Sequence, residues 1–487
     1  MYDKNTDARR KAYKEYSNDR IPEDALNSQN VFTPYDLCYD IIRKLESKTD
    51  LIDKDILIFN LEFAEILIHD FGVSPERIAF WTDCDEKRKF AQLMYKGIKH
   101  HRVEFNRESI VIMTKNAKDI EAKDKFDVVI GNPPYQGDSD QSRNTSGKNE
   151  GRNKLLWPKF IELSLELVQN KGYVCLVHPA LWRKPEHYVW DILINKNLLY
   201  LEIHSKQDGD KVFKATTRYD WYVLQNDFYK GKTIVIDQNG RQLEVDLTDK
   251  HCLPNMDIEK FFELVITGKE KPLKIFYTTK YHNQNIDVKK SQSGEFVHPV
   301  MHSITKDGPV IYYTNAKKKG TFRKKKVIIN TGDNIYAIFD KKGEYGTTEG
   351  CFSIIVDSVE EGNNILKAIT SDSFKIIVKS TKWSNFRMDY KMFKYFRKDF
   401  WKGFITWEYA VEQTVIRFCQ NHDTNVFTLK QFMKEEFKTI LDWVRPEGKT
   451  PKSTLLAILC GLRNKGILTF VDGKGIYKYL GVLNSPD

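Results

Sequence analysis

Residues 126–136 read FDVVIGNPPYQ, an apolar run that leads directly into Asn132-Pro133-Pro134-Tyr135. The run from Phe126 to Gly131 has the length and composition of a buried strand. Ligands of a mostly parallel sheet bind at the carboxyl ends of its strands, and the Asn-Pro-Pro-Tyr turn would lie at that edge. This turn is therefore the candidate reaction site.

The groups in this turn suit an exocyclic amine as substrate. The two prolines lack amide hydrogens and so contribute carbonyl acceptors, and Asn132 adds a side-chain carbonyl. Two acceptors that hold both N–H hydrogens would restore lone-pair character to an amine whose electrons are delocalised into a ring. Tyr135 offers an aromatic face for a base swung out of a duplex. The alternative interpretation is a proline-rich turn with a structural asparagine.

The surrounding sequence predicts an α/β fold. Short apolar runs alternate with helical patterns from Asp55 to Leu224, which indicates a mostly parallel sheet with helices on both faces. The expected strands are 55–59, 77–81, 109–113, 126–131, 173–178, 200–204 and 221–225.

The rhythm changes after Gln225, where short β-prone runs between polar loops predict a second, α+β domain. From Phe404 onward, helical patterns at 406–420, 428–444 and 453–466 precede two β-prone runs, which is the order of a winged helix. We expect three domains: 1–225, with a helical extension in residues 1–30, then 226–402 and 403–487.

Composition excludes several classes of protein. No apolar stretch of about 18 residues is present, and the start is too charged for a signal peptide, so we expect a cytoplasmic protein without a membrane segment. The seven cysteines are scattered and never spaced as CxxC, which predicts neither a disulfide framework nor a metal site.

Positive charge is concentrated in one stretch. Between Met301 and Asn330, eight basic residues face one acidic residue, a net +7 out of +10 for the whole chain. Such a cluster is typical of a surface that meets nucleic-acid phosphates. A solvated lysine-rich loop is the alternative.

The Asn-Pro-Pro-Tyr turn after an apolar strand resembles the catalytic motif of amino-group methyltransferases that use S-adenosylmethionine, chiefly the DNA adenine-N6 enzymes. Residues 28–400 resemble the gamma class, in particular the Eco57I-like modification methylases, and 403–487 resembles the winged-helix tail of DpnI-type restriction enzymes. The resemblance implies a Rossmann-like S-adenosylmethionine-dependent methyltransferase fold, then a target-recognition domain. It also implies site-specific methylation of flipped adenine N6 in duplex DNA, within a restriction-modification or viral modification system.

The resemblance also assigns cofactor residues. It implies Thr33 in the first cofactor segment, Asn60 and Glu62 at the methionine end, Asp83 at the ribose hydroxyls, and Asn116 at the adenine amino group of S-adenosylmethionine. The turn after the first strand contains no glycine, and Asn116 stands where the family usually has aspartate. Both are departures from the family pattern.

DNA contacts follow from charge and from the same resemblance. Phe213 would supply a second aromatic against the flipped base, although a core phenylalanine is an equal alternative. Base edges are assigned to Trp383, Asn385 and Arg387, and the tail helix contributes Lys452, Ser453 and Arg463, although winged helices also dock proteins. The expected phosphate contacts are Lys317, Lys318, Lys319, Arg323, Lys324, Lys325 and Lys326.

Two other functions remain open from sequence. One is an RNA-adenine or protein-glutamine methyltransferase, because the same motif serves those groups. The other is a DNA-binding specificity subunit whose methyltransferase fold has lost the cofactor, which the glycine-free turn favours. We find no endonuclease motif, so a restriction activity would belong to a separate chain.

Overall fold

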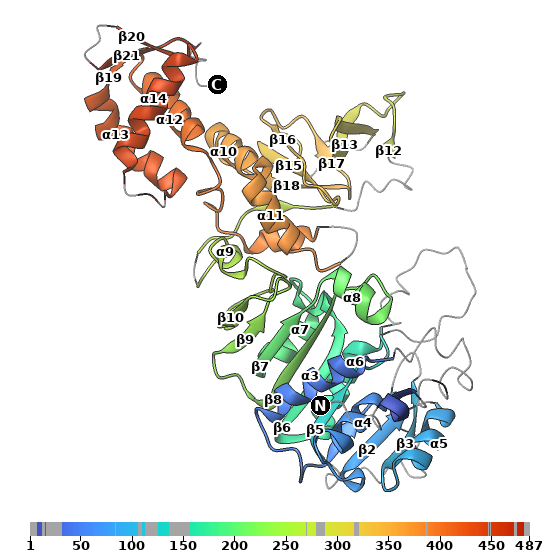
Figure 1. Ribbon diagram of the computed structural model, residues 1–487. Helices are drawn as coiled ribbons and strands as arrows, with labels where there is room; N and C mark the ends of the chain where they lie inside the picture. Colours follow the sequence, from blue (N-terminus) through green and yellow to red (C-terminus); the bar gives the residue numbers. More distant parts are fainter. Residues whose placement is uncertain are drawn as a thin grey trace. The chain divides into compact units, whose positions relative to one another are not determined.

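In the computed structural model, the chain forms two compact units (Figure 1). The first comprises Met1–Ile258 with Trp383–Asn385, and the second Glu259–Lys382 with Phe386–Asp487. The residues that the structure describes are 7–11, 15, 32–82, 84–105, 110–112, 125–135, 155–268, 270–278, 288–315, 321–384, 388–446, 448, 450–471 and 475–481.

The first unit is built on a sheet of ten strands in the order β10-β9-β7-β8-β6-β5-β1-β2-β3-β4. Strands β1, β2, β3, β5 and β6 run parallel to their neighbours within this group, whereas β8 runs antiparallel to both β6 and β7. The strands are β1 (Ile56–Ile58), β2 (Ile78–Thr82), β3 (Lys99–Phe105), β4 (Ile110–Ile112), β5 (Phe126–Gly131), β6 (Val168–Pro179), β7 (Lys196–Ile203), β8 (Tyr219–Phe228), β9 (Thr233–Ile236) and β10 (Gln242–Val245).

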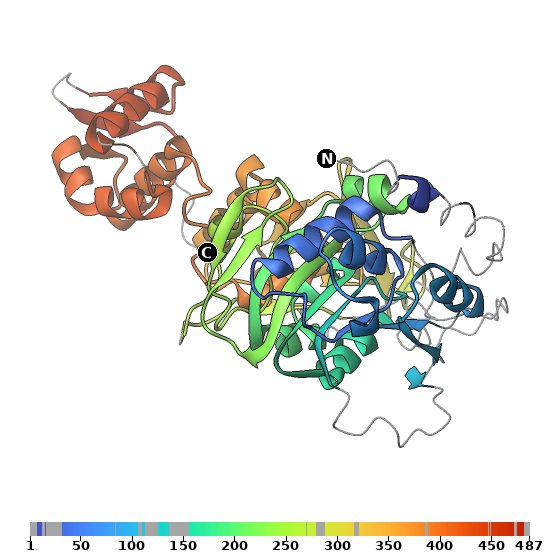
Figure 2. The ribbon, with the colours of Figure 1, turned by 60° about the horizontal axis from the view of Figure 1, so that its bottom comes forward.

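Helices cover both faces of this sheet because side chains alternate along each strand. Ile56 and Ile58 pack with α3, α4 and α5, and both ribbon views show α3 lying across β8 (Figures 1 and 2). On the other face, Trp157 of α6 stacks on His178 of β6. The helices of the unit are α3 (Tyr35–Glu46), α4 (Glu62–His69), η1 (Pro75–Arg77), α5 (Asp85–Met94), α6 (Trp157–Leu167), η3 (Ala180–Arg183), α7 (Tyr188–Ile194) and α8 (Lys206–Phe213).

The strand order creates a switch point beside β1. From β1 the chain crosses through α4 to β2 on one side, while β5 pairs with β1 on the other side. In open α/β sheets the ligand crevice lies outside the carboxyl ends of strands at such a point. The turns after β1 and β5 therefore meet at the ligand-binding edge.

The α/β fold expected from sequence is confirmed, and each expected strand has a counterpart. Strand β3 was missed because KHHRVEF has no apolar run. The sheet also extends past the expected boundary at residue 225, since β9 pairs with β7 and β10 pairs with β9. The short polar turns around these strands hid their place in the sheet.

The second unit begins with an α+β region of two four-stranded sheets, β11-β18-β15-β16 and β12-β14-β13-β17. Its expected strands and helices are present. They are α9 (Ile258–Phe262), β11 (Ile275–Phe276), β12 (Val288–Lys289), β13 (His298–Thr305), β14 (Gly308–Thr314), β15 (Lys326–Asn330), β16 (Ala337–Asp340), β17 (Gly346–Thr347), β18 (Cys351–Ile355), α10 (Val359–Thr370), α11 (Asp372–Ser380) and η4 (Tyr390–Tyr395).

The end of the chain has the expected three helices and hairpin, with one additional strand. Strand β19 joins the hairpin to give the sheet β19-β21-β20. The elements are α12 (Trp407–Asn421), β19 (Val426–Thr428), α13 (Leu429–Val444), α14 (Pro451–Asn464), β20 (Leu468–Phe470) and β21 (Ile476–Tyr479).

At the other end of the chain, residues 7–11 and 15 of the expected extension are described and are helical. Arg9 contacts Glu65 at 3.1 Å and Arg10 contacts Asp70 at 3.5 Å, so this segment pairs with α4. Among the residues described, no helix has the length and apolar character needed to cross a membrane.

Lys326 corrects part of the charge analysis. Its side chain is fully buried, and Nζ lies 2.5 Å from Asp340 Oδ2 and also donates to the carbonyl oxygens of Thr321 and Lys324. Burial lowers the pKa of Lys326, while the Asp340 contact opposes that effect. The side chain holds β15 to β16 and is not available to a phosphate.

Breaking this pair should destabilise the second unit. We expect Lys326→Ala to lower the free energy of unfolding by about 3–5 kcal/mol, because it leaves the Asp340 carboxylate buried without its partner. Lys325→Ala, an exposed neighbour, should change it by less than about 0.5 kcal/mol. Denaturant unfolding of both variants tests this, and equal stabilities would contradict the structural role of Lys326.

Candidate active site

Asn132 is held by two segments that are distant from it in sequence. Its backbone N–H donates to Asn60 Oδ1 at 2.5 Å, and its Nδ2 donates to Thr33 Oγ1 at 3.2 Å. Thr33 precedes α3, and Asn60 follows β1. All three residues are buried, so both the backbone and the side chain of Asn132 are fixed at the switch point.

These two bonds orient the side chain of Asn132, but its side-chain carbonyl oxygen takes part in neither of them. Asn132 Oδ1 is buried and has no hydrogen-bond partner among the described residues. Burying an acceptor without a donor is costly, so such an atom needs an explanation, and a role in binding or in a reaction is one of them. The structure therefore presents one unsatisfied acceptor at the carboxyl end of β5.

Gly131 allows the turns after β1 and β5 to approach this closely. A Cβ atom at Gly131 would lie 2.9 Å from Phe59 Cβ and 3.1 Å from Asn60 Oδ1. Any larger residue would push Asn60 away from the Asn132 amide. The glycine thus belongs to the geometry of the site.

Tyr135 is fixed at the other end of the turn from Asn132. Its carbonyl accepts from the Leu156 amide at 3.1 Å, which ties the turn to the start of α6. Its hydroxyl is buried without a partner in the part of the chain that is described. Burial, reinforced by Tyr219 and Asp220, raises the pKa of Tyr135, so the hydroxyl stays neutral.

Tyr219 is a site aromatic that sequence reasoning missed. It packs edge-on against Phe213, with ring centroids 4.9 Å apart, and stacks on His204 at 4.3 Å. It pairs with Pro179, the last residue of β6, so it lies at the same edge of the sheet as the turn. Because β8 runs antiparallel to β6, its first residues lie at the edge where β6 ends; the reversed direction of β8 is the signal that would have identified Tyr219.

Phe213 itself lies at the end of α8, half-buried against the core. Its contact with Tyr219 is compatible with both interpretations made from the sequence, a core phenylalanine and an aromatic residue next to the site.

A buried ion pair supports the edge where β8 starts. Arg183 Nε lies 2.7 Å from Asp220 Oδ2, and Arg183 also donates to Asn255 Oδ1 at 2.8 Å. Next to this pair, Trp383 Nε1 donates to the Leu253 carbonyl at 2.7 Å. The expected contact of Trp383 with base edges is wrong for this conformation, because its indole is buried and its only N–H is already bonded.

The expected cofactor residues fall into two groups. Thr33, Asn60 and Glu62 are buried at the switch point, with Glu62 in the first turn of α4. The side-chain oxygens of Thr33 and Asn60 are used by Asn132, so both residues position the turn. Asp83 and Asn116 lie outside the described residues.

The expected DNA-contacting residues are only partly described. Arg323, Lys324 and Lys325 are exposed in the turn before β15, whereas Lys317, Lys318, Lys319, Asn385 and Arg387 lie outside the described residues. Lys452 and Ser453 are exposed in the first turn of α14, and the Arg463 guanidinium lies 4.9 Å from the centroid of Phe470.

Comparison with known proteins finds a family match over the part of the chain that contains the α/β sheet and the candidate site. Residues 62–213 match the family described as Eco57I restriction-modification methylase. This match confirms the expected resemblance to that group over the part of the chain that contains Asn132.

Individual relatives are distant. The chain is 27% identical over 136 residues to a protein described as an uncharacterized adenine-specific methylase from Mycoplasma pneumoniae, covering 26% of this chain and 30% of that relative. A modification subunit of a putative type I restriction enzyme from Vibrio vulnificus YJ016 is 13% identical, covers 53% of this chain and 55% of that chain, and has a TM-score of 0.35. The type IIL restriction-modification enzyme MmeI is 10% identical and has a TM-score of 0.44. The match covers 88% of this chain and 76% of that chain.

His178 lies at the end of β6 in the buried layer beside the turn. It stacks on Trp157 at 5.0 Å between centroids, and its Nε2 is buried without a partner among the described residues. Burial lowers the pKa of His178 to about 4. The ring is therefore neutral at physiological pH.

This burial predicts a pH dependence of stability. A histidine whose pKa is lower in the folded state than in the unfolded state stabilises the protein above pH 6.5, and that stability is lost as the pH falls toward 4. We expect the wild type to lose up to about 3 kcal/mol more than His178→Gln between pH 7 and pH 4. Denaturant unfolding at several pH values measures this, and parallel curves for the two proteins would contradict it.

Proposed function

We propose that the protein transfers a methyl group from S-adenosylmethionine to the N6 amine of an adenine flipped out of duplex DNA. The observation that carries this proposal is the buried, unpartnered Oδ1 of Asn132, held at the switch point of the sheet. The match of residues 62–213 to Eco57I modification methylases and the adenine-specific relative support the same reaction.

The proposed role of Asn132 follows from the chemistry of the amine. Adenine N6 is a weak nucleophile because its lone pair is delocalised into the ring. An acceptor fixed before the substrate binds can accept a hydrogen bond from one N–H without reorganisation, which is the source of electrostatic catalysis. In the transfer the sulfur–methyl bond would break, the N6–methyl bond would form, and N6 would release one proton to solvent. The backbone carbonyls of the prolines that follow are the candidates for the second acceptor.

The residues at the switch point fit the cofactor. S-adenosylmethionine would supply the methyl group on a sulfonium centre, and its methionine end carries an ammonium group. Glu62 provides a buried carboxylate in the first turn of α4, the helix that follows β1, which suits that ammonium. Thr33 and Asn60, which hold Asn132, would border the same space and so link cofactor and turn.

Substituting Asn132 tests the reaction. We expect Asn132→Ala to lower the rate of methyl transfer to duplex DNA by about 100-fold to 1,000-fold or more, because it removes an acceptor needed in the transition state. DNA affinity should stay nearly unchanged. Transfer of labelled methyl groups in single-turnover assays measures the first effect, and duplex titration measures the second.

Two further proteins make the test selective. Asn421→Ala, an exposed asparagine at the end of α12, should methylate like the wild type. Tyr135→Ala should be less severe than Asn132→Ala, since stacking contributes about 1–3 kcal/mol per base. Near-normal turnover of Asn132→Ala would refute the mechanism. Calorimetry with S-adenosylmethionine separates an active enzyme from a specificity subunit that has lost the cofactor.

DNA binding is proposed for two exposed groups of residues in the second unit. Arg323, Lys324 and Lys325 form a cationic turn before β15, which suits phosphates. Lys452 and Ser453 lie in the first turn of α14. The recognition helices of winged-helix proteins contact base edges with their N-terminal residues. We therefore assign affinity to the turn and discrimination to the helix.

Neutralising the cationic turn should change the salt dependence of binding. We expect glutamine at Arg323, Lys324 and Lys325 to weaken all duplexes alike and to reduce the slope of log affinity against log salt by about 0.9 per lost phosphate contact. A variant with glutamine at Lys171, Lys230 and Lys232, exposed cations of the first unit, carries the same charge change. Equal slopes for the two variants would argue against the turn, and alanine at Lys452 and Ser453 should alter only the ratio of cognate to scrambled affinity.

A further inference from the structure

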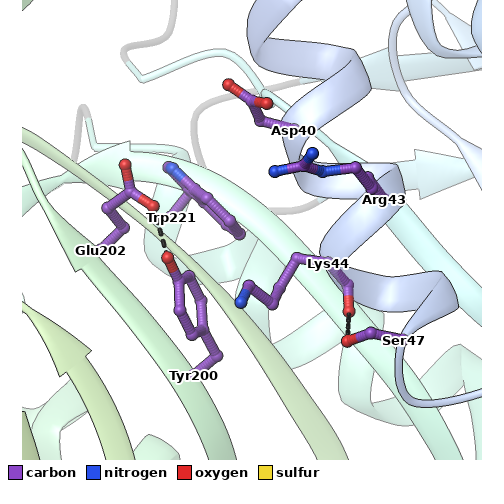
Figure 3. A pocket seen from close by; sticks show the side chains of 7 residues that line it. All are labelled: Asp40, Arg43, Lys44, Ser47, Tyr200, Glu202 and Trp221. Carbon is purple, nitrogen blue, oxygen red and sulfur yellow. Dashed lines mark hydrogen bonds between the residues drawn. The ribbon is translucent and has the colours of Figure 1, made fainter. Parts of the chain in front are cut away.

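A cavity lies between α3 and the strands β7 and β8, and none of the residues that line it belongs to the turn that contains Asn132 (Figure 3). Its volume is about 480 Å³, which is enough for a small metabolite. One wall is the polar stripe of α3 and the other is the sheet. The residues that line it are Asp40, Arg43, Lys44, Ser47, Tyr200, Glu202 and Trp221.

The cavity contains two cations without an ionic partner. Neither Arg43 nor Lys44 has a carboxylate within 4 Å among the described residues, although ion pairs are frequent elsewhere in this unit. Lys44 Nζ instead lies 4.3 Å from the centroid of the Tyr200 ring. Figure 3 shows both side chains extending from α3 toward the strands.

A third donor comes from the sheet. Trp221 is 2% exposed, and its Nε1 is buried with no acceptor in the described part of the chain. In Figure 3 the indole nitrogen is at the end of the ring toward Glu202. Native proteins rarely leave such a donor unsatisfied, so its position in a cavity wall points to an acceptor supplied from outside.

Of the two carboxylates of the cavity, Glu202 already has bonded partners. Glu202 accepts from the Tyr200 hydroxyl at 2.6 Å and lies 3.3 Å from His204 Nε2. Burial raises the pKa of Asp40 against the opposing effect of Arg43. The side-chain donors of the cavity for which no hydrogen bond to a described residue is found are therefore those of Arg43, Lys44 and Trp221, with Asp40 as the carboxylate opposite them in charge.

We propose that this cavity binds a phosphate group, with Arg43, Lys44 and the Trp221 N–H as its donors. Arginine and lysine are the side chains proteins use for phosphate, and several acceptor oxygens suit donors that come from two sides. The volume leaves room for an organic body attached to the phosphate. Two sources offer this chemistry: a free nucleotide or similar ester, and a backbone phosphate of bound DNA. The site does not depend on the methyl-transfer proposal.

Calorimetric titration of the full chain with inorganic phosphate and with adenosine monophosphate tests the site. We expect the wild type to bind with millimolar or tighter affinity, and Arg43→Gln/Lys44→Gln to bind at least about 10-fold more weakly. Trp221→Phe keeps the ring but removes the donor and should weaken binding about 3-fold to 10-fold. Lys48→Gln, just beyond the end of α3 and outside the cavity lining, should bind like the wild type.

The outcomes decide both the site and its ligand. Equal affinity of the double variant and the wild type, or no binding to the wild type, would overturn the proposal, with circular dichroism as the check that each variant is folded. If a saturating duplex abolishes phosphate binding, and the double variant also binds duplex more weakly, the ligand is a DNA phosphate. If duplex and phosphate bind together, the ligand is a free small molecule.

Discussion

The hydrogen bond from the Asn132 amide to Asn60 Oδ1 holds the candidate site together. It joins the turn after β5 to the turn after β1, and these two strands flank the switch point of the sheet. The bond forms only because Gly131 has no side chain to separate the two turns. Thr33 then fixes the amide group of Asn132, and this leaves the Asn132 side-chain oxygen buried without a hydrogen-bond partner among the described residues. The turn after β1 contains no glycine, and the side chain of Asn60 in that turn makes the contact that holds the turn containing Asn132.

Much of the fold could be predicted because its signals are local. The strand from Phe126 to Gly131 is a continuous apolar run, and its bounds in the structure are those expected from sequence. Strand β3 escaped because KHHRVEF carries its charges on a strand next to the edge of the sheet, where apolar runs are not required. The direction of β8 also escaped, since an apolar run does not reveal which way a strand points. Tyr219 was missed for that reason.

The site could be predicted only where roles follow from residue type and strand ends. Thr33 and Asn60 both bond to Asn132, and Glu62 is buried in the first turn of α4, while the assignment of the three residues to the cofactor stays a prediction. The expected DNA contacts of Lys326 and Trp383 were wrong because burial depends on tertiary packing. Lys326 belongs to a basic run but is buried against Asp340, and Trp383 lies in a polar segment but bonds to the Leu253 carbonyl. A count of charge along the sequence treats Lys326 as a surface residue, although its side chain is buried.

The pairing of β7 with β8 is irregular between Lys196 and Asn197 and again between Leu198 and Tyr200, where β7 contains one extra residue. Leu198 pairs with Leu224 and Tyr200 with Val223, so Leu199 is a bulge. From that point on, the residues of β7 are shifted by one place, and side chains alternate between the two faces of a strand. The bulge therefore decides that Tyr200 and Glu202 lie on the same face as Trp221 and beside α3. If Leu199 paired with Val223 instead, the strand and most of its hydrogen bonds would remain. Tyr200 and Glu202 would then turn to the opposite face, and the cavity would lose one wall.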